Sequence, residues 1–253
     1  MYQQRGAWHG LDPLNTGLTA KVKGFSLRNR YSAGVSPPPA PVFALLAGYL
    51  LGSVSFALLL ARLAGVNLRQ VGSGNLGATN AGRALGAKWA VVVYCLDALK
   101  GWLVPWVCLN LEVSPQLDGY LTPDHWRWLA AAGAGAGAWM GHVWPLWHGF
   151  KGGKGAATLS GAFLALEPMA VLGAAVVFLL ATIVIRYMSV SSMAFGLCLP
   201  LSVWLLDSNI GDGPRRPVMI FACCAAVLTF WTHRSNLGRL RRGEETPIGG
   251  NKQ

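Results

Sequence analysis

Two glycine-rich segments carry the side chains of this chain that are best suited to chemistry. The first reads RQVGSGNLGATNAGRALG, from Arg69 to Gly86, and the second reads GFKGGKGAAT, from Gly149 to Thr158. Glycine lets backbone amides approach an anion closely, hydroxyl and amide side chains add neutral hydrogen bonds, and arginine or lysine adds charge. Both segments therefore predict a binding site for a phosphate-like anion.

Neither segment is a standard nucleotide-binding loop. Residues 72–77 fit G-x-G-x-x-G, but the preceding GVNLRQV is polar, whereas a dinucleotide loop follows a buried strand. In the second segment Gly155 stands where a Walker loop needs serine or threonine after the lysine. The alternatives are a plain turn between helices and lipid-headgroup contact by the two lysines. The predicted anion-binding residues are Gly72, Ser73, Gly74, Asn75, Gly77, Thr79, Asn80, Arg83, Lys151, Gly152, Gly153, Lys154 and Gly155.

Two shorter polar segments follow later in the chain. They read RYMSVSS, from Arg186 to Ser192, and HRSNLGRLRRGEE, from His233 to Glu245. Each is weak evidence alone, because serines can cap a helix and basic residues can end a membrane span. If all four polar segments emerge on one side of a membrane, however, they can form one site.

The composition predicts that helices crossing a membrane position these segments. Hydrophobic residues make up 53% of the chain and charged residues only 12%, far below the roughly 25% of a soluble domain. Six stretches lack charge or nearly so, with lengths scattered around the ~20 residues of a membrane-spanning helix. They are Val42 to Ala61, Trp89 to Asn110, Trp126 to Trp147, Ala156 to Ile185, Ser189 to Leu206 and Val218 to Thr232. The fold class is therefore expected to be all-α, a polytopic membrane helix bundle.

The fourth stretch is too long for one span, and Glu167-Pro168 divides it into a hairpin because proline removes a helical donor. The count then becomes about seven transmembrane helices. With the N-terminus outside, 12 basic residues fall on the side of the four polar segments and eight on the other. Lysine and arginine are in excess on the cytoplasmic side of membrane proteins, so we expect a cytosolic C-terminus and site. A single span over residues 156–185 would reverse this bias.

The remaining composition argues against other classes of protein. The net charge of +11 is spread over membrane-flanking loops, which does not fit a nucleic-acid-binding domain. The five cysteines lie in apolar stretches without metal-type spacing, so no metal is expected. Residues 1–41 are basic and end in SPPPAP, which indicates a disordered or non-native extension. The membrane domain is placed at residues 42–245 and a flexible tail at residues 246–253.

Two features lie inside the predicted spans. Asp97 and Lys100 are three residues apart on one helix face, which predicts a buried ion pair or, alternatively, contact with substrate. Glycines recur every four residues in GAGAGAWMG and predict close helix packing: Gly133, Gly137 and Gly141. His142 follows this seam, and we expect it to hydrogen-bond within the bundle.

Five stretches together carry a family resemblance: VGSGNLGATNAGRALG, LDALKG, GHVWPLWHGFKGGKGAAT, RYMSVSS and HRSNLGRLRRGEE. In order and spacing they resemble the bacterial acyl-phosphate:glycerol-3-phosphate acyltransferases, integral membrane enzymes that make lysophosphatidate. The resemblance runs from about Val42 to Glu245. It implies a multi-pass protein of the bacterial inner (plasma) membrane, with seven helices, an external N-terminus and a cytosolic active site.

The resemblance also implies the chemistry. Glycerol 3-phosphate and acyl phosphate are the expected substrates and membrane lipid the surroundings, with no cofactor, no coenzyme A and no nucleic acid. The expected catalytic residues are Ser73, Arg83, Lys154, Ser192, His233 and Asn236. Two tail positions depart from the family pattern, which often has arginine where Thr232 stands and glutamate where Ser235 stands.

Residue chemistry alone leaves alternatives open. A phosphate-type anion transporter would use similar groups, although the glycine-rich segments gather on one face and no repeat of the first half appears in the second. An assembly protein without catalysis would leave the serines, basic residues and histidine unexplained. For an acyltransferase, the proton acceptor is either the substrate's own phosphate or His233 acting without a paired carboxylate.

Overall fold

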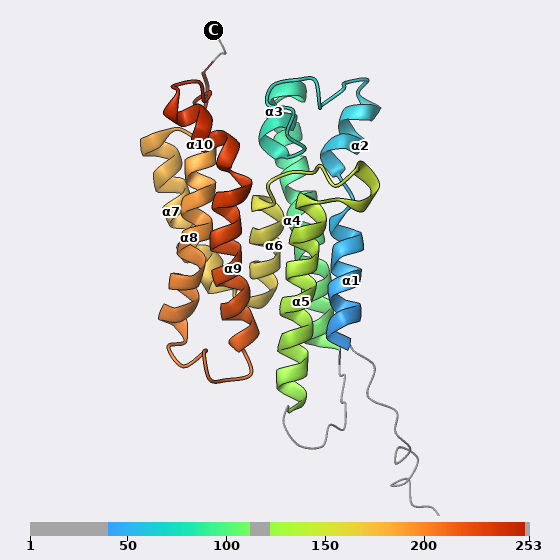
Figure 1. Cartoon of the computed structure of the whole chain (residues 1–253), viewed down its shortest axis with the longest axis vertical. Helices are drawn as coiled ribbons and strands as arrows, with labels where there is room; N and C mark the ends of the chain where they lie inside the picture. Colours follow the sequence, from blue (N-terminus) through green and yellow to red (C-terminus); the bar gives the residue numbers. More distant parts are fainter. Residues whose placement is uncertain (1–39, 112–121, 251–253) are drawn as a thin grey trace, which may run out of the picture. The chain divides into compact units, whose positions relative to one another are not determined.

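Helices form the regular secondary structure of residues 40–111 and 122–250, which the computed structural model describes (Figure 1). These residues belong to one unit, residues 37–253. In chain order the elements are α1 Ala40–Gly52, α2 Phe56–Leu63, α3 Ala78–Leu85, α4 Ala87–Asn110, α5 Pro123–Val143, η2 Leu146–His148, α6 Ala156–Leu166, α7 Pro168–Ile185, α8 Met188–Leu206, α9 Arg216–Thr232 and α10 Arg234–Arg241. The all-α prediction is confirmed for this part of the chain. The predicted extension, residues 1–41, lies outside it apart from Ala40 and Pro41, which begin α1.

Several helices are long and apolar enough to cross a membrane. Four segments meet this criterion: Ala40–Leu63, which joins α1 and α2, together with α4, α7 and α8. The pair α9 and α10 is a fifth candidate, although the two helices are bent by 48°. The apolar helix α6 has only 11 residues. These lengths support a multi-pass membrane protein, whereas the count of seven and the sides of the termini stay predictions.

The first predicted span is interrupted. Residues 42–61 were expected to form one helix, but α1 ends at Gly52 and α2 begins only at Phe56. Ser55 caps α2 by accepting a hydrogen bond from the amide of Leu58. The Ser53 hydroxyl donates to the carbonyl of Tyr49 and accepts a hydrogen bond from the amide of Leu146, at the start of η2. Serine side chains that bond to nearby backbone compete with helical hydrogen bonding, and here they stabilise a break.

The predicted hairpin at Glu167-Pro168 is confirmed. Helix α6 ends at Leu166, Glu167 lies between the helices, and Pro168 is the first residue of α7. Proline is tolerated at this position because the first helical amide has no partner within its own helix. The buried Glu167 carboxylate pairs with Arg215, which precedes α9, so the turn is also tied to the loop after α8.

Helices α1 and α5 pack through the predicted glycine seam. A Cβ on Gly137 would collide with the carbonyl oxygen of Leu45, and one on Gly141 with that of Tyr49. Gly133 is less confined, since the nearest atom to such a Cβ is 3.5 Å away. Small residues let two backbones approach closely in this way, so the seam fixes the position of α5, from which the second glycine-rich segment leaves.

Candidate functional site

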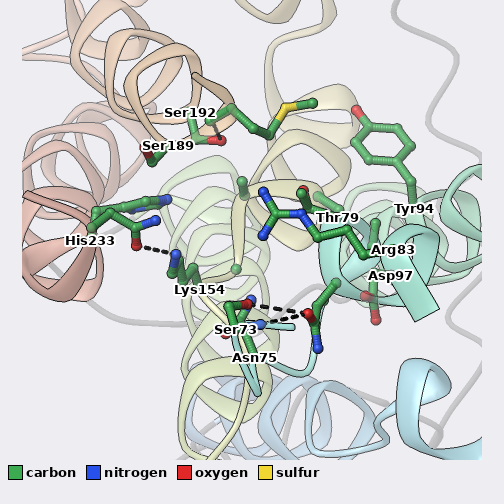
Figure 2. A pocket seen from close by; sticks show the side chains of 18 of the residues that line it. Ser73, Asn75, Thr79, Arg83, Tyr94, Asp97, Lys154, Ser189, Ser192 and His233 are labelled. Atoms are coloured by element: carbon green, nitrogen blue, oxygen red, sulfur yellow. Dashed lines mark hydrogen bonds between the residues drawn. The ribbon is translucent and has the colours of Figure 1, made fainter. Parts of the chain in front are cut away.

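One cavity is lined by residues from all four polar segments (Figure 2). From the predicted set it contains Ser73, Asn75, Gly77, Thr79, Asn80, Arg83, Lys154, Gly155, Ser192, His233 and Asn236. Figure 2 shows Arg83 extending toward the middle of this cavity, with Ser192 and Ser73 on different sides of it. The predicted residues that do not line the cavity are Gly72, Gly74, Lys151, Gly152 and Gly153. The convergence expected from the sequence is therefore observed for eleven of the predicted residues.

Asn80 organises the first glycine-rich segment. Its Oδ1 accepts hydrogen bonds from the amide of Ser73 at 2.9 Å and from the Ser73 hydroxyl at 3.3 Å. Its Nδ2 donates to the carbonyls of Leu68 and Val71 at 3.2 and 3.0 Å. Gly72 has a φ of +61°, and a Cβ there would collide with the Asn80 amide. Asn80 thus holds the segment in shape and places Ser73 at the cavity, a role more specific than the donor predicted from the sequence.

Arg83 brings the first charge to the site. It lies in the last turn of α3, and its guanidinium donates to the carbonyl of Thr246 at 3.4 Å. Further along, the amide of Ile248 donates to the carbonyl of Arg186 at 2.7 Å. Residues 246–250, predicted to be a flexible tail, therefore form hydrogen bonds with two of the other polar segments.

The amides of the second glycine-rich segment are mostly used within the protein. The amide of Gly152 donates to the carbonyl of Val143, and that of Gly153 to the carbonyl of His142, both at 3.1 Å. Gly155 has a φ of +83° and caps the N-terminus of α6 against the ring of Trp139. Glycine is required at this position because φ is positive and a Cβ would meet the indole. The turn directs Lys154 into the cavity.

Lys154 is part of a polar network with the last segment. Its Nζ donates to Oδ1 of Asn236. The amide of Asn236 in turn donates through Nδ2 to Oε1 of Glu245 at 2.6 Å, and Arg239 donates through Nε to Oε2 of the same carboxylate at 2.7 Å. Glu245 therefore fixes which end of the Asn236 amide faces Lys154.

The environment shifts the protonation of both charged ends of this network. Burial lowers the pKa of Lys154 to about 8, in spite of the nearby Glu245 carboxylate, and the charges of Arg239 and Arg83 lower it further. Burial alone would raise the pKa of Glu245, but the hydrogen bonds from Asn236 and Arg239 hold it below its usual value. At neutral pH the site thus has a cationic lysine beside an ionised glutamate.

His233 lies between α9 and α10, where it is buried. Its Nδ1 lies 2.8 Å from the carbonyl oxygen of Thr229, so Nδ1 carries a proton and donates to that carbonyl. Burial lowers the pKa of His233 to about 4, and the charge of Lys154 adds to the shift. The imidazole is therefore neutral at physiological pH, with Nε2 as a hydrogen-bond acceptor.

The third segment contributes two serines from the first two turns of α8. The Ser192 hydroxyl lines the cavity and donates to the carbonyl of Met188 at 2.8 Å, which leaves its lone pairs available. Ser189 also lines the cavity, and its buried hydroxyl has no hydrogen-bond partner within the described residues. Ser189 was not among the predicted site residues. Its three-residue spacing from Ser192 places both serines on one helix face, and this spacing could have identified it as a site residue.

Sequence reasoning did not assign other residues that line the cavity. Arg239 and Glu245 lie within a quoted segment, Asp97 was expected to form an ion pair or, alternatively, to contact substrate, and His142 was expected to hydrogen-bond within the bundle. Apolar contacts come from one side chain each of α4, α7 and α8: Tyr94, Phe178 and Met188. The cavity thus combines three cations, Arg83, Lys154 and Arg239, with neutral donors and an apolar wall. This combination suits an amphiphilic molecule that carries phosphate. Within residues 40–111 and 122–250 there is no cluster of side chains that could hold a metal ion.

Comparison with known proteins now decides the family. The family model described as "Glycerol-3-phosphate acyltransferase" matches residues 42–243. The chain belongs to this family. It is 38% identical over 213 residues to the glycerol-3-phosphate acyltransferase of Agrobacterium fabrum, covering 84% of this chain and 94% of that protein. It is 40% identical over 212 residues to that of Halalkalibacterium halodurans, covering 83% and 96%.

The glycerol-3-phosphate acyltransferase family also includes solved structures that are similar to this chain. The crystal structure of PlsY, an integral membrane glycerol 3-phosphate acyltransferase, in its glycerol 3-phosphate form matches with a TM-score of 0.71 at 34% identity. The match covers 83% of this chain and 96% of that one. The lysophosphatidic acid form of PlsY matches with a TM-score of 0.69 at 33% identity. The family resemblance expected from the sequence is thus confirmed.

Proposed function

We propose that this protein transfers an acyl chain from acyl phosphate to the 1-hydroxyl of glycerol 3-phosphate. The products are 1-acylglycerol 3-phosphate, which is lysophosphatidate, and inorganic phosphate, and the reaction is the first step of phospholipid synthesis. The observation that carries the proposal is that Arg83, Lys154 and His233, from three distant segments, line one cavity. The similarity to PlsY, whose structures are described with glycerol 3-phosphate and lysophosphatidic acid, supports the choice of substrate.

In the proposed reaction the 1-hydroxyl oxygen attacks the carbonyl carbon of the acyl phosphate. A carbon–oxygen ester bond forms, the bond between that carbon and the phosphate oxygen breaks, and the phosphate leaves with the bonding electrons. This leaving group needs little protonation, so the site must mainly hold two phosphates, align them and stabilise the oxyanion. Arg83 and Lys154 supply charge, while Ser73, Ser192 and Asn236 supply neutral hydrogen bonds.

The hydroxyl proton goes to a phosphate oxygen in this proposal. The second pKa of a phosphate monoester is about 6, so the dianion is a stronger base than an imidazole whose pKa is about 4. We assign His233 to accept a hydrogen bond from the attacking hydroxyl through Nε2, which orients the nucleophile. The catalytic set thus remains Ser73, Arg83, Lys154, Ser192, His233 and Asn236, with Glu245 holding Asn236 in place.

The experiment is a reaction of purified protein in detergent with an acyl phosphate. Phosphate release should depend on glycerol 3-phosphate, and lysophosphatidate should appear in equal amount. An acyl-coenzyme A should not replace the acyl phosphate. If the protein consumes acyl phosphate at the same rate without glycerol 3-phosphate, or uses only acyl-coenzyme A, the proposal is wrong.

A location also belongs to the proposal. We place the protein in the bacterial inner (plasma) membrane as a multi-pass protein, with membrane lipid around it and the cavity facing the cytosol. The support is the excess of basic residues near the four polar segments, 12 against eight. A cytosolic site would receive glycerol 3-phosphate directly from solution, while the apolar wall would receive the acyl chain from the bilayer.

A further inference from the structure

Three ionisable side chains are buried together between α4 and α5, beside the cavity. Asp97 and Lys100 of α4 are exposed by 1% and 2%, and His142 at the end of α5 by 7%. Charged groups within membrane helices are costly and are kept mainly where they have a function. The catalytic set described above leaves these three residues without one.

Their contacts tie two helices and a helix break together. Lys100 Nζ lies 2.8 Å from Asp97 Oδ1 and donates to the carbonyl of Val54 at 2.7 Å. Val54 lies in the break between α1 and α2, where its carbonyl is outside regular helical bonding. His142 Nδ1 lies 3.5 Å from the same carboxylate oxygen of Asp97. The predicted ion pair of Asp97 and Lys100 is therefore confirmed, and the His142 ring lies beside its carboxylate.

His142 connects this group to the glycine-rich loop that carries Lys154. Its carbonyl accepts the hydrogen bond from the amide of Gly153 at 3.1 Å. Its imidazole lies directly against the same residue, because a Cβ on Gly153 would collide with Nε2. Gly153 immediately precedes Lys154. His142 thus holds the backbone of Gly153 in two ways, through the His142 carbonyl and through the His142 ring.

The geometry points to a positioning role rather than proton transfer. A histidine paired with a carboxylate resembles a general-base dyad, and both Asp97 and His142 line the cavity. However, the nitrogen that a base would use, Nε2, faces Gly153. The next residue, Lys154, is the one that must be placed accurately against a phosphate, and misplacement by 1 Å can cost about a hundredfold in rate.

We propose that Asp97, Lys100 and His142 form a positioning unit that fixes Gly153 and thereby sets the place of the Lys154 ammonium group in the cavity. The inference rests on the proposed function, in which Lys154 binds phosphate. In this proposal the three residues act through Lys154 rather than through contact with the substrates. A buried pair that served only the fold would be replaceable by apolar residues of similar size, often without loss of stability.

The first test is a double-mutant cycle on kcat/KM for glycerol 3-phosphate. Asp97→Asn should lower kcat/KM by at least about tenfold in the wild-type background and by much less in the Lys154→Ala background, since residues that act as a unit are non-additive. Glu167→Gln is the matched control, because Glu167 is a buried carboxylate paired with an arginine on another turn of the bundle. It should leave kcat/KM unchanged in both backgrounds. Equal losses from Asp97→Asn with and without Lys154 would overturn the inference.

A second test does not depend on activity. Hydrogen–deuterium exchange of residues 149–158 should speed up in Asp97→Asn and His142→Ala, whereas Glu167→Gln should leave it unchanged. Unchanged exchange in the two variants would contradict the positioning role even if the enzymatic proposal failed. Conversely, an inactive wild-type protein would contradict the proposed function while this measurement still decides the structural inference.

A third variant separates positioning from folding. Asp97→Leu combined with Lys100→Met replaces the ion pair by apolar side chains, and the product should fold with a Tm close to that of the wild type. Its kcat/KM should nevertheless fall by at least about tenfold, because His142 loses its partner on α4. A folded double variant with wild-type kcat/KM would show that the pair serves the fold alone.

Discussion

Lys154, which precedes α6, donates a hydrogen bond through Nζ to Oδ1 of Asn236 in α10, 82 residues later in the chain. The Asn236 amide is oriented by Glu245 of its own segment, so that Oδ1 faces Lys154 of the second glycine-rich segment. The contact brings an ammonium group and a neutral amide to the same wall of the cavity. We expect both to face the phosphate of a bound substrate.

The protonation of Lys154 should limit activity at alkaline pH. Its pKa of about 8 means that the cation is present below this pH and is lost as the pH rises through it. If the cation binds phosphate, kcat/KM should therefore fall above about pH 8, as the free enzyme loses the proton. Lys154→Arg, whose guanidinium stays charged, should retain activity to higher pH. The measurement is kcat/KM as a function of pH, and the same alkaline limb in both proteins would exclude Lys154 as its origin.

Removal of either central charge should weaken the transition state strongly. Arg83→Ala and Lys154→Ala should each lose at least about 2 kcal/mol of transition-state stabilisation, calculated from kcat/KM, the scale of a charged partner removed from a buried phosphate. Arg242→Ala is the control, because Arg242 is exposed, pairs with Glu244 and does not line the cavity. Near wild-type turnover in both site variants, with normal melting, would refute the double-anion site.

The glycine seam should be essential at one position and tolerant at another. Gly137→Ala should lower the free energy of unfolding by about 2 kcal/mol or more, because the new Cβ meets the Leu45 carbonyl and forces α1 and α5 apart. Gly133→Ala, on the same helix, should be tolerated, because its new Cβ would lie 3.5 Å from the nearest atom, the carbonyl oxygen of Pro41. Thermal unfolding in detergent checks this, and equal Tm values for the two variants would contradict the packing argument.

Transfer should be direct, without an acyl-enzyme intermediate. The Ser73 hydroxyl is bonded to the side chain of Asn80, which cannot activate it as a base would. When substrate is bound, we expect the Ser73 O–H to turn from Asn80 and donate to a phosphate or to the developing oxyanion. Double-reciprocal plots should intersect when both substrates are varied. Parallel plots together with a mass increase of one acyl chain on the peptide from Val71 to Arg83 would establish a two-step mechanism instead.

The proposed topology can be checked with single cysteines. After replacement of the five native cysteines, Arg242→Cys should be labelled only from the cytosolic side and Gly211→Cys, in the turn between α8 and α9, only from outside. Both positions are exposed. Labelling of the two from the same side would eliminate the proposed seven-span topology.

Local properties of the sequence determined much of the fold. Hydropathy identified the apolar helices, Pro168 marked the start of α7, and the spacing of Gly137 and Gly141 indicated a seam of close helix packing. These features could be predicted because each depends on the period or backbone chemistry of a single segment. The break at residues 53–55 could not, since hydropathy does not register two serines whose hydroxyls bond to backbone.

The sequence by itself also determined which residue types meet at the site, because four polar segments had to emerge from apolar helices. Only the tertiary structure decided what each residue does there. The Gly153 amide, expected to bind an anion, donates to His142, and Asn80 folds its own loop. Asp97 reaches His142 from another helix, and Lys154 reaches Asn236 from another segment. The physical reason is that a hydrogen-bonding group has few partners to satisfy, and those partners come from segments whose neighbours are set by helix packing rather than by sequence order.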